Sequence, residues 1–285
     1  MAKEINVLSF NKFKQNKQKI VALTAYDYSL ARILDNCDVD VILVGDSLGM
    51  VALGQPTTHG VTVDDIIHHT KAVVRAVKKV FVVADMPFMS YQSDFKTAVD
   101  NAGRLIKEGG AKAVKIEGAC GHNLNIIKHL TQIGIPVMGH LGFTPQSVNA
   151  FGGNLVQAKE IDTITKLLND AKALENSGVF SLVLEMVPSE VAKLITEQLS
   201  IPTIGIGAGS STDGQILVTQ DMLGLSTDFK PKFVRQYLNM ADLITTAVNN
   251  YASDVKKISF PDTNESFALE ANEVKNLNNL LGSKN

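Results

Sequence analysis

The stretch Val41-Ile-Leu-Val-Gly-Asp-Ser-Leu-Gly-Met50 decides the fold class of this 285-residue chain. Its first four residues are aliphatic and three of them are β-branched, which is typical of a strand that is buried on both faces. Strands of this kind form the parallel sheets of α/β proteins, in which ligands bind just beyond the carboxyl ends of the strands. Asp46 and Ser47 therefore follow a predicted strand at the position where chemistry is expected.

Further aliphatic segments bring the number of predicted strands to about eight. The predicted strands span residues 20–25, 41–45, 80–85, 112–117, 135–139, 179–185, 201–206 and 221–225. Segments with helical periodicity separate them. Eight strand–helix units in a chain of this length favour an α/β fold, a (β/α)8 TIM barrel, over an open doubly wound sheet. The open sheet usually has fewer strands and an early dinucleotide-binding fingerprint, which is missing here.

The segments between the strands carry signals for helix starts, faces and ends. One stripe at helical spacing, predicted to pack on the sheet, consists of Leu30, Ile33, Leu34 and Cys37. Thr62 and Asp65 have the spacing of a capping box that opens a helix. Gly109-Gly110, Gly134 and Gly178 stand where helices should stop before the next strand. A final helix is predicted over residues 231–251.

Composition restricts the partners and the compartment. The net charge of -2 gives no electrostatic case for nucleic acid or an anionic membrane as a partner. The two cysteines, Cys37 and Cys120, lack metal-binding spacing, so we expect both in the core of a cytoplasmic protein. Secretory signal and membrane-span patterns are absent. We expect an N-terminal segment (1–19) packed on the barrel, a catalytic barrel (20–252), and a polar, partly mobile C-terminal extension (253–285).

Polar side chains recur at the ends of the predicted strands. They are Asp46 and Ser47 after the second strand, Asp85 after the third, Lys115 and Glu117 on the fourth, His140 after the fifth, and Glu185 after the sixth. Lys115 and Glu117 are two residues apart and so point to the same face, which must be the barrel interior. Burying a lysine and a carboxylate there is costly, so the pair suggests a functional purpose.

Three carboxylates from three strands, Asp46, Asp85 and Glu117, would repel one another unless a cation lay between them. Ligation by oxygen alone selects Mg²⁺ or a similar hard ion over zinc. Because Mg²⁺ keeps positions for substrate oxygens, a substrate with adjacent keto and carboxylate oxygens could chelate it. Lys115 would then balance the substrate carboxylate.

Each of these residues also has a purely structural interpretation. An Asp after a strand is often the N-cap of the next helix, and Lys115 with Glu117 could form a structural ion pair. Glu185 could interact with a nearby helix N-terminus, and His140 could brace a loop. The pattern Gly205-Ile-Gly-Ala-Gly209 could either bind a phosphate or the tail of a ligand, or only form a tight turn. The coincidence of the acids, Lys115 and His140 on one rim favours a site.

Several longer motifs surround these residues. They are Thr24-Ala-Tyr-Asp-Tyr28, Val44-Gly-Asp-Ser-Leu-Gly-Met50, Val83-Ala-Asp-Met-Pro-Phe-Met-Ser-Tyr91, Pro136-Val-Met-Gly-His-Leu-Gly142 with Thr144-Pro-Gln-Ser147, and Ile204-Gly-Ile-Gly-Ala-Gly209. Together they closely resemble the ketopantoate hydroxymethyltransferase family, from about residue 21 to about residue 267. The chain departs from the family pattern at His59-Gly60, at Asn154-Leu155 and at Ala158, all in loops near the barrel mouth.

The resemblance implies a Mg²⁺-dependent barrel of the phosphoenolpyruvate/pyruvate superfamily, usually a large homo-oligomer and often a decamer. It implies transfer of a hydroxymethyl group from 5,10-methylenetetrahydrofolate to 3-methyl-2-oxobutanoate, through a Mg²⁺-stabilised enolate, in pantothenate biosynthesis. Asp46, Asp85 and Glu117 match the metal ligands, directly or through water. Ser47 and Lys115 match residues that contact the oxo acid, and Glu185 matches the general base.

The residues expected to bind the substrate are Asp46, Ser47, Asp85, Lys115 and His140. Two other functions remain open from the residues alone. One is a Mg²⁺-dependent lyase or phosphomutase acting on a related 2-oxo acid; such a lyase would carry a catalytic cysteine in a mouth loop, where we do not expect Cys37 or Cys120. The other is a metabolite-binding barrel without catalysis.

Overall fold

The computed structural model describes residues 4–226 and 231–282. The chain divides into two compact units, one up to Tyr237 and one from Leu238 onward, and the barrel lies in the first. The boundaries expected from the sequence, 1–19, 20–252 and 253–285, differ from this division and stay a prediction.

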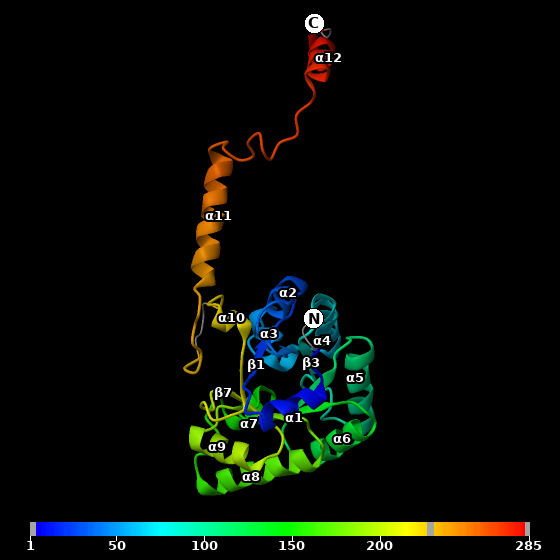
Figure 1. Cartoon of the computed structure of the whole chain (residues 1–285), viewed down its shortest axis with the longest axis vertical. Coiled ribbons are helices and arrows are strands. Elements are labelled where there is room, and N and C mark those ends of the chain that lie inside the picture. Colours follow the sequence, from blue (N-terminus) through cyan, green and yellow to red (C-terminus); the bar gives the residue numbers. More distant parts are fainter. Residues whose placement is uncertain (1–3, 227–230, 283–285) are drawn as a thin grey trace. The chain divides into compact units, whose positions relative to one another are not determined.

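Eight parallel strands close into a barrel in which every strand pairs with its neighbours in chain order, β1 with β8 included (Figure 1). The strands are β1 Ile20–Thr24, β2 Val41–Val44, β3 Phe81–Asp85, β4 Ala113–Glu117, β5 Val137–Gly142, β6 Ser181–Glu185, β7 Thr203–Ile206 and β8 Gly214–Leu217. The expected (β/α)8 barrel is confirmed. Parallel order brings the carboxyl ends of all eight strands to one mouth.

The first seven predicted strands are confirmed, and the eighth is wrong. Residues 221–225, predicted as a strand, lie in the short helix α10 (Thr219–Met222) and the turn after it, and β8 comes earlier. β8 contains only two aliphatic residues because its first position must be small. A Cβ on Gly214 would lie 2.5 Å from the carbonyl oxygen of Ile20 on β1. This close approach between strands is a tertiary requirement that an aliphatic pattern does not signal.

The strand side chains alternate between two cores. Val114 and Ile116 of β4 belong to the cluster that packs between the sheet and the outer helices, as expected. Ala113 belongs to the interior cluster, and the period of two places Lys115 and Glu117 on the same inward face. The interior of the barrel is therefore apolar toward the amino ends of the strands and charged toward the mouth.

An aromatic cluster closes the amino-terminal end of the barrel. Phe10 of helix α1 (Val7–Gln15) is fully buried, and its ring meets those of Phe81 and Phe180 edge to face, with centroids 5.3 and 4.8 Å apart. Lys14 of the same helix pairs with Asp213 at 2.8 Å. Together these contacts hold α1 against the end of the barrel opposite the mouth.

Helices cover the outside of the barrel (Figure 1). The longer ones are α2 Tyr28–Asp35, α4 Val63–Ala76, α5 Phe95–Lys107, α6 Gly121–Gln132, α8 Ile161–Asn176 and α9 Ser189–Gln198. The capping box predicted for α4 is present, because Thr62 and Asp65 exchange hydrogen bonds at its start. Gly110, Gly134 and Gly178 have positive φ angles, which supports their predicted role at helix ends.

Two predictions about buried side chains are partly or wholly wrong. Of the predicted stripe on α2, Leu34 is buried and Leu30 packs against the core, but Ile33 is 60% exposed and Cys37 lies beyond the helix end. Both Cys37 and Cys120 are exposed, although we expected them in the core. The predicted stripe begins at the third residue of α2, and the helix ends at Asp35, two residues before Cys37.

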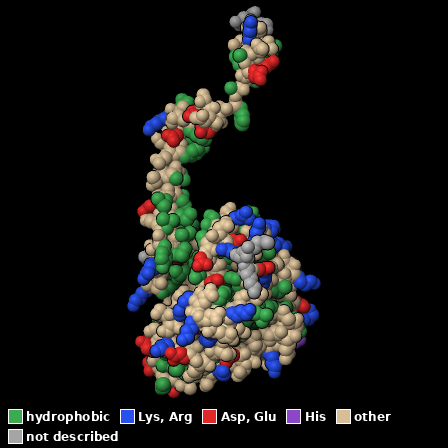
Figure 2. All heavy atoms as spheres, viewed as in Figure 1, with side chains coloured by type: hydrophobic (Ala, Val, Ile, Leu, Met, Phe, Trp, Pro, Cys, Tyr) green, Lys and Arg blue, Asp and Glu red, His purple; other side chains and the backbone are tan. Residues whose placement is uncertain are grey.

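The second unit contains helices α11 (Met240–Lys256) and α12 (Ala271–Gly282). α11 starts later than the predicted 231–251 helix because Asn239 caps it by accepting a hydrogen bond from Asp242 N–H. Hydrophobic side chains gather along α11 (Figure 2), and Leu243, Val248 and Tyr251 are each more than half exposed. In the described ranges, none of the helices combines the length and the apolar character that crossing a bilayer requires.

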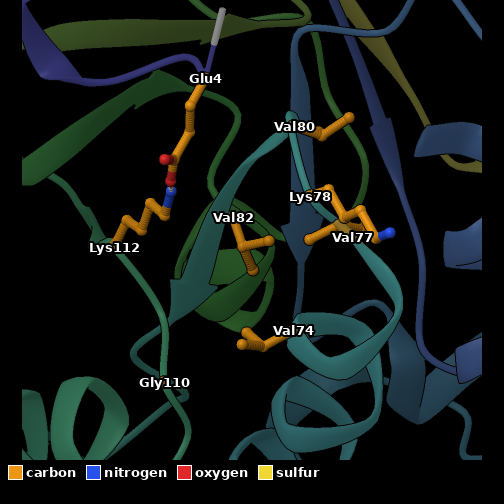
Figure 3. Close-up of a pocket in the computed structure, with 8 residues that line it drawn as sticks. All are labelled: Glu4, Val74, Val77, Lys78, Val80, Val82, Gly110 and Lys112. Atoms are coloured by element: carbon orange, nitrogen blue, oxygen red, sulfur yellow. Dashed lines mark hydrogen bonds and ion pairs between the residues drawn. The ribbon is translucent and has the colours of Figure 1, made fainter. Parts of the chain in front are cut away.

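A small cavity of about 140 Å³ lies near the amino ends of β3 and β4. Figure 3 shows Lys112 and Glu4 pointing toward one another, with Val74, Val80 and Val82, which also line the cavity, to one side of them. This cavity is at the opposite end of the strands from the polar residues predicted to do chemistry.

Candidate active site

The polar residues predicted from the strand ends come together at the mouth. They form what we call the strand-end cluster: Asp46, Asp85, Lys115, Glu117, His140 and Glu185. Five of the six side chains are at most 5% exposed, and Glu185, at the last position of β6, is 15% exposed. Charged groups this deeply buried require partners, and the contacts below supply them.

Asp46 and Asp85 are joined through the backbone. The main-chain N–H of Asp46 donates to Oδ2 of Asp85 at 2.9 Å, and Oδ2 of Asp46 accepts from Nε2 of Gln146 at 2.9 Å. Neither carboxylate therefore points at a helix N-terminus. The interpretation of both residues as N-caps is wrong, since the helices that follow them, α3 (Leu48–Val51) and α5, have Ser47 and Asp94 at their N-cap positions.

Lys115 lies among the carboxylates. Its Nζ is 2.8 Å from Oδ1 of Asp85 and 3.5 Å from Oε1 of Glu117. Burial acts to lower the pKa of Lys115, but Asp85, Glu117 and Asp46 together raise it above the usual lysine value. Lys115 is therefore a fixed positive charge at neutral pH. It compensates the negative charges of Asp85 and Glu117, in addition to its expected role of balancing the substrate carboxylate.

His140 links two of the acids. Its Nδ1 lies 3.3 Å from Oε1 of Glu117, and its Nε2 lies 3.3 Å from Oε2 of Glu185. Burial and the neighbouring Lys115 both lower the pKa of His140, but Glu117 and Glu185 outweigh them and raise it to about 9. His140 is thus more than a loop brace, because it places a second positive charge between the ends of β4 and β6.

The three acids differ in how well nearby positive charge compensates their carboxylates. Burial raises the pKa of Asp46 well above its usual range, and Asp85 and Glu117 raise it further. Burial also raises the pKa of Asp85, although Lys115 opposes it. Burial would raise the pKa of Glu117 too, but Lys115 and His140 hold it below the usual value. Lys115 and His140 therefore stabilise the carboxylate of Glu117, whereas the charged forms of Asp46 and Asp85 are less well compensated.

Ser47 lies beside this acidic corner. Its Oγ is 2.8 Å from the hydroxyl of Tyr26, which is buried at the end of β1. The residue before Asp46 must be small, because a Cβ on Gly45 would lie 3.0 Å from Oγ of Ser47 and 3.2 Å from Oδ2 of Asp85. The Gly-Asp-Ser sequence at the end of β2 thus lets two polar side chains share one narrow space.

Glu185 is positioned by the neighbouring strand β5. Its carbonyl oxygen accepts a hydrogen bond from Phe143 N–H at 2.8 Å. Gly142 has φ +91°, and a Cβ there would overlap the carbonyl oxygen of Glu185 and lie 2.6 Å from Cγ2 of Val187. Because this position tolerates only glycine, β5 can run close enough to β6 to bring His140 within reach of Glu185.

Sequence reasoning missed two buried residues that organise the cluster, Gln146 and Tyr91. Gln146, in the short 3-10 helix η2 (Pro145–Ser147), contacts Asp46 and Glu117. The Tyr91 hydroxyl donates to Oε1 of Gln146 at 2.8 Å and accepts from the N–H of Glu117 at 3.2 Å. Both residues belong to the quoted motifs, but neither has a spacing or charge signature; their burial is the signal that identifies them.

Two departures from the family pattern have a structural setting. Nε2 of His59 lies 3.0 Å from the carbonyl oxygen of Gln146. Because a carbonyl oxygen can only accept, His59 is the donor of this hydrogen bond. Its ring also lies against Phe88, with centroids 4.6 Å apart. Ala158, where the family more usually has glycine, is buried with φ +57°, a conformation that glycine adopts more readily.

The carboxylate oxygens of the strand-end cluster suit an open site for a hard cation better than a site in which protein ligands surround the metal. Among the described residues, no three His, Cys, Asp or Glu side chains stand ready to hold a metal ion. Mg²⁺, however, usually takes one or two carboxylates and keeps its remaining positions for water and substrate. Oδ1 of buried Asp85 has no hydrogen-bond partner among the described residues, only the ion pair with Lys115. Asp46 and Asp85 are therefore the acids with oxygen available for a cation.

Comparisons with known proteins give one family. The sequence profile of ketopantoate hydroxymethyltransferase matches residues 4–263. The chain is similar to the 3-methyl-2-oxobutanoate hydroxymethyltransferase of Thermoanaerobacter sp. strain X514, with 54% identity over 96% of this chain and 100% of that protein. Its identity to the proteins of the same name from Clostridium acetobutylicum and Clostridioides difficile is 54% and 52%, over 92% and 95% of this chain and 95% and 98% of those proteins.

Solved structures share the architecture. Phosphonopyruvate hydrolase, in a complex with oxalate and Mg²⁺, superimposes with a TM-score of 0.59 at 10% identity, over 98% of this chain and 97% of that one. 2,3-Dimethylmalate lyase, a member of the PEP mutase/isocitrate lyase superfamily, gives a TM-score of 0.57 at 15% identity, over 93% of this chain and 89% of that one. At these identities the likeness shows the fold alone, and that fold is the (β/α)8 barrel described above.

Proposed function

Because this chain belongs to the ketopantoate hydroxymethyltransferase family, we propose that the strand-end cluster transfers a hydroxymethyl group from 5,10-methylenetetrahydrofolate to 3-methyl-2-oxobutanoate. The products are 2-dehydropantoate and tetrahydrofolate, and the reaction belongs to the biosynthesis of pantothenate and coenzyme A. The observation that carries the assignment of the site is the burial of Asp46, Asp85, Lys115 and Glu117 at one mouth.

Asp46 and Asp85 would hold a Mg²⁺ ion, with Glu117 contributing directly or through water. Oδ1 of Asp85 has only the ion pair with Lys115 among the described residues, and burial together with repulsion by Asp85 and Glu117 raises the pKa of Asp46. Both observations support this choice of residues. When bound, the ion would supply positive charge for the keto and carboxylate oxygens of the oxo acid, which favours loss of the C3 proton.

Lys115, Ser47 and His140 would bind the oxo acid. Lys115 and protonated His140 are the two buried cations of the site, and a carboxylate substrate fits their charge. The hydroxyl of Ser47, held by Tyr26, is free to reorient toward a substrate oxygen because the hydrogen bond between them can run in either direction.

Glu185 would act as the general base. It is the most exposed carboxylate of the cluster and contacts His140 at 3.3 Å, so it can reach a ligand in the mouth. It would accept the proton from C3 of the oxo acid, and the resulting carbanion would attack the methylene carbon of the folate. Addition of water completes the release of the folate nitrogen and leaves the new carbon as a hydroxymethyl group.

The test is proton exchange at C3 of 3-methyl-2-oxobutanoate in deuterated water without folate, together with assay of 2-dehydropantoate formation. Glu185→Gln is expected to lower both rates about 10²–10⁴-fold while oxo-acid binding is retained. The control, Glu190→Gln on an exposed position of α9, is expected to match the wild type. Undiminished exchange in Glu185→Gln would show that this residue is not the base. Full activity in the presence of EDTA would refute the proposed role of the metal.

The lyase or phosphomutase alternative is not favoured, since relatives with more than half of their residues identical are hydroxymethyltransferases by name. The position of Cys120 does not decide the matter. Contrary to our expectation, it lies in the loop after β4 on the mouth side, at the N-cap of α6.

We also propose a homo-oligomer, a decamer in line with the family, in the cytoplasm. Two apolar surfaces support an assembly. One is the exposed hydrophobic face of α11. The other is a groove of about 590 Å³ on the barrel unit, where Val21 of β1 and Phe233 lie beside Gln215 of β8. Analytical ultracentrifugation of the wild type would measure the mass directly, and a monomer at micromolar concentration would refute the proposal.

A further inference from the structure

We propose that Gln146 is a positioning residue that fixes Asp46 and Glu117 in the arrangement that binds a divalent cation. The inference rests on the proposed function and extends it to a residue outside the acidic set. The observation behind it is a single buried residue, 4% exposed, whose side chain contacts Asp46 after β2 and Met86 after β3 and whose main chain contacts Glu117 of β4.

The side-chain amide of Gln146 uses its full hydrogen-bonding capacity. Nε2 donates to Oδ2 of Asp46 at 2.9 Å and to the carbonyl oxygen of Met86 at 3.0 Å. Oε1 accepts from the hydroxyl of Tyr91 at 2.8 Å and from Nε2 of Gln92 at 2.9 Å. Both N–H groups of the amide thus meet acceptors, and its oxygen meets two donors. Exchanging the nitrogen and the oxygen would break all four hydrogen bonds, so the partners determine the orientation of the amide.

The main chain of Gln146 contacts a second acid. Its N–H donates to Oε2 of Glu117 at 3.1 Å, and its carbonyl oxygen accepts from Nε2 of His59 at 3.0 Å. Tyr91 reinforces the link, because its hydroxyl accepts from the N–H of Glu117 while it donates to the Gln146 side chain. The same residue after β5 therefore holds both Asp46, after β2, and Glu117, on β4.

This arrangement matters for a cation because the two acids repel each other. Glu117 is one of the charges that raise the pKa of Asp46, and the Gln146 hydrogen bond acts against that shift. The role requires a side chain that donates to both Asp46 and the Met86 carbonyl without adding negative charge. A carboxylate at position 146 would add charge and face Oδ2 of Asp46 with an acceptor, and an apolar side chain would leave Asp46 and the Met86 carbonyl without their donor.

The closing experiment measures Mn²⁺ binding to the full-length protein by electron paramagnetic resonance, without substrate, beside the Mg²⁺ dependence of the steady-state rate. Gln146→Met keeps the length of the side chain and removes the amide. Loss of a partner that orients a metal ligand typically weakens metal binding about 10–100-fold, and we expect a change of that size in the Mn²⁺ Kd. In the steady-state assay of Gln146→Met, we expect excess Mg²⁺ to restore part of the lost turnover rate.

The control is Asn101→Leu, which removes a partly buried amide whose Nδ2 donates to the carbonyl oxygen of Ser90 at 2.8 Å. It should lower the Tm without changing the Mn²⁺ Kd, which separates positioning from general loss of stability. Gln146→Asn keeps an amide but is one methylene shorter, so it cannot reach Asp46 and Tyr91 together. It provides the same measurement should the methionine variant not fold.

An Mn²⁺ Kd within about twofold of wild type, in whichever Gln146 variant folds, would overturn the inference while leaving the proposed function intact. An equal loss of Mn²⁺ affinity in Asn101→Leu would overturn it as well, because the effect would then follow stability. Failure of the wild type itself to bind Mn²⁺ would instead refute the metal site on which both proposals depend.

Discussion

Replacing Lys115 by methionine removes the central positive charge of the cluster without a large change in volume. The ammonium lies 2.8 Å from Asp85 and 3.5 Å from Glu117, and all three side chains are at most 5% exposed. Removing one partner of such a buried pair costs about 3–5 kcal/mol, because the remaining charges stay desolvated. For a folded unit of this size, about 2–4 °C of Tm accompanies each kcal/mol, so the Tm should fall by about 6–20 °C at pH 7.

The pH dependence of that loss distinguishes charge from packing. Without Lys115, the pKa values of Asp46 and Asp85 in the folded state rise further above their unfolded value of about 4, and the pKa of Glu117 is no longer held down by this lysine. A carboxyl whose folded pKa exceeds its unfolded pKa costs stability at higher pH and ceases to do so as the pH falls toward the unfolded value. The difference in Tm between Lys115→Met and wild type should therefore shrink when the pH is lowered from 7 to 5. Added Mg²⁺ should also raise the Tm of the variant more than that of wild type.

Differential scanning calorimetry with Lys14→Met as the control makes the comparison specific. Lys14 has an ion pair of the same length, 2.8 Å to Asp213, but both partners are 17% exposed and lie at the other end of the barrel. Its loss should cost only about 1–2 kcal/mol and should not respond to Mg²⁺. A Tm of Lys115→Met within about 2 °C of wild type, or a Mg²⁺ response shared by Lys14→Met, would refute the reasoning.

Three further predictions concern positions outside the acidic corner. Phe10→Ala should lower the free energy of unfolding by about 3–5 kcal/mol in urea titrations, because it opens a cavity against two aromatic rings, while the KM for the oxo acid stays unchanged; an altered KM would contradict the separation of the two barrel ends. Gly142→Ala should reduce turnover more than tenfold, since the new Cβ would displace Glu185. Its control, Gly134→Ala, is also at positive φ but in open space, so it should cost only about 1 kcal/mol of stability and no activity. Equal activities of the two variants would show that β5 can shift to accommodate the new methyl group. Burial would raise the pKa of Glu175, but Lys172 and Ser200 lower it, so its carboxylate stabilises the fold above about pH 4 and loses that effect as the pH falls through its folded-state pKa. Glu175→Gln should then be about 1 kcal/mol less stable than wild type at pH 7 and equal to it near pH 3, and a difference that persists at pH 3 would contradict this interpretation.

The strands that could be predicted are those whose stability comes from their own aliphatic residues. Val41–Val44 is buried on both faces, and four aliphatic residues in a row signal this directly. β8 could not be found in this way, because Gly214 and Gln215 have no intrinsic preference for a strand. They form one because β1 and β7 lie on either side and supply the hydrogen bonds, a condition that exists only in the closed barrel.

The candidate site divides along the same line. The acids were predictable because each follows a strand, and a parallel barrel must bring those ends together. The family resemblance then supplied a role for each of them. The contacts of Lys115 with Asp85 and of His140 with Glu185 depend on side-chain reach between neighbouring strands, which spacing along one strand does not give. Gln146 was missed for a further reason, since its importance comes from partners on other elements and not from its own chemistry.

The hydrogen bond from the main-chain N–H of Asp46 to Asp85 makes the two acids unequal in how they depend on sequence. Any residue except proline supplies that N–H, so the orientation of Asp85 does not require an acid at position 46. The orientation of Asp46, by contrast, depends on the identity of one distant side chain, Gln146. A lineage in which position 146 changes would therefore lose the use of Asp46 first, whereas Asp85 would keep its place for as long as β2 and β3 remain neighbours.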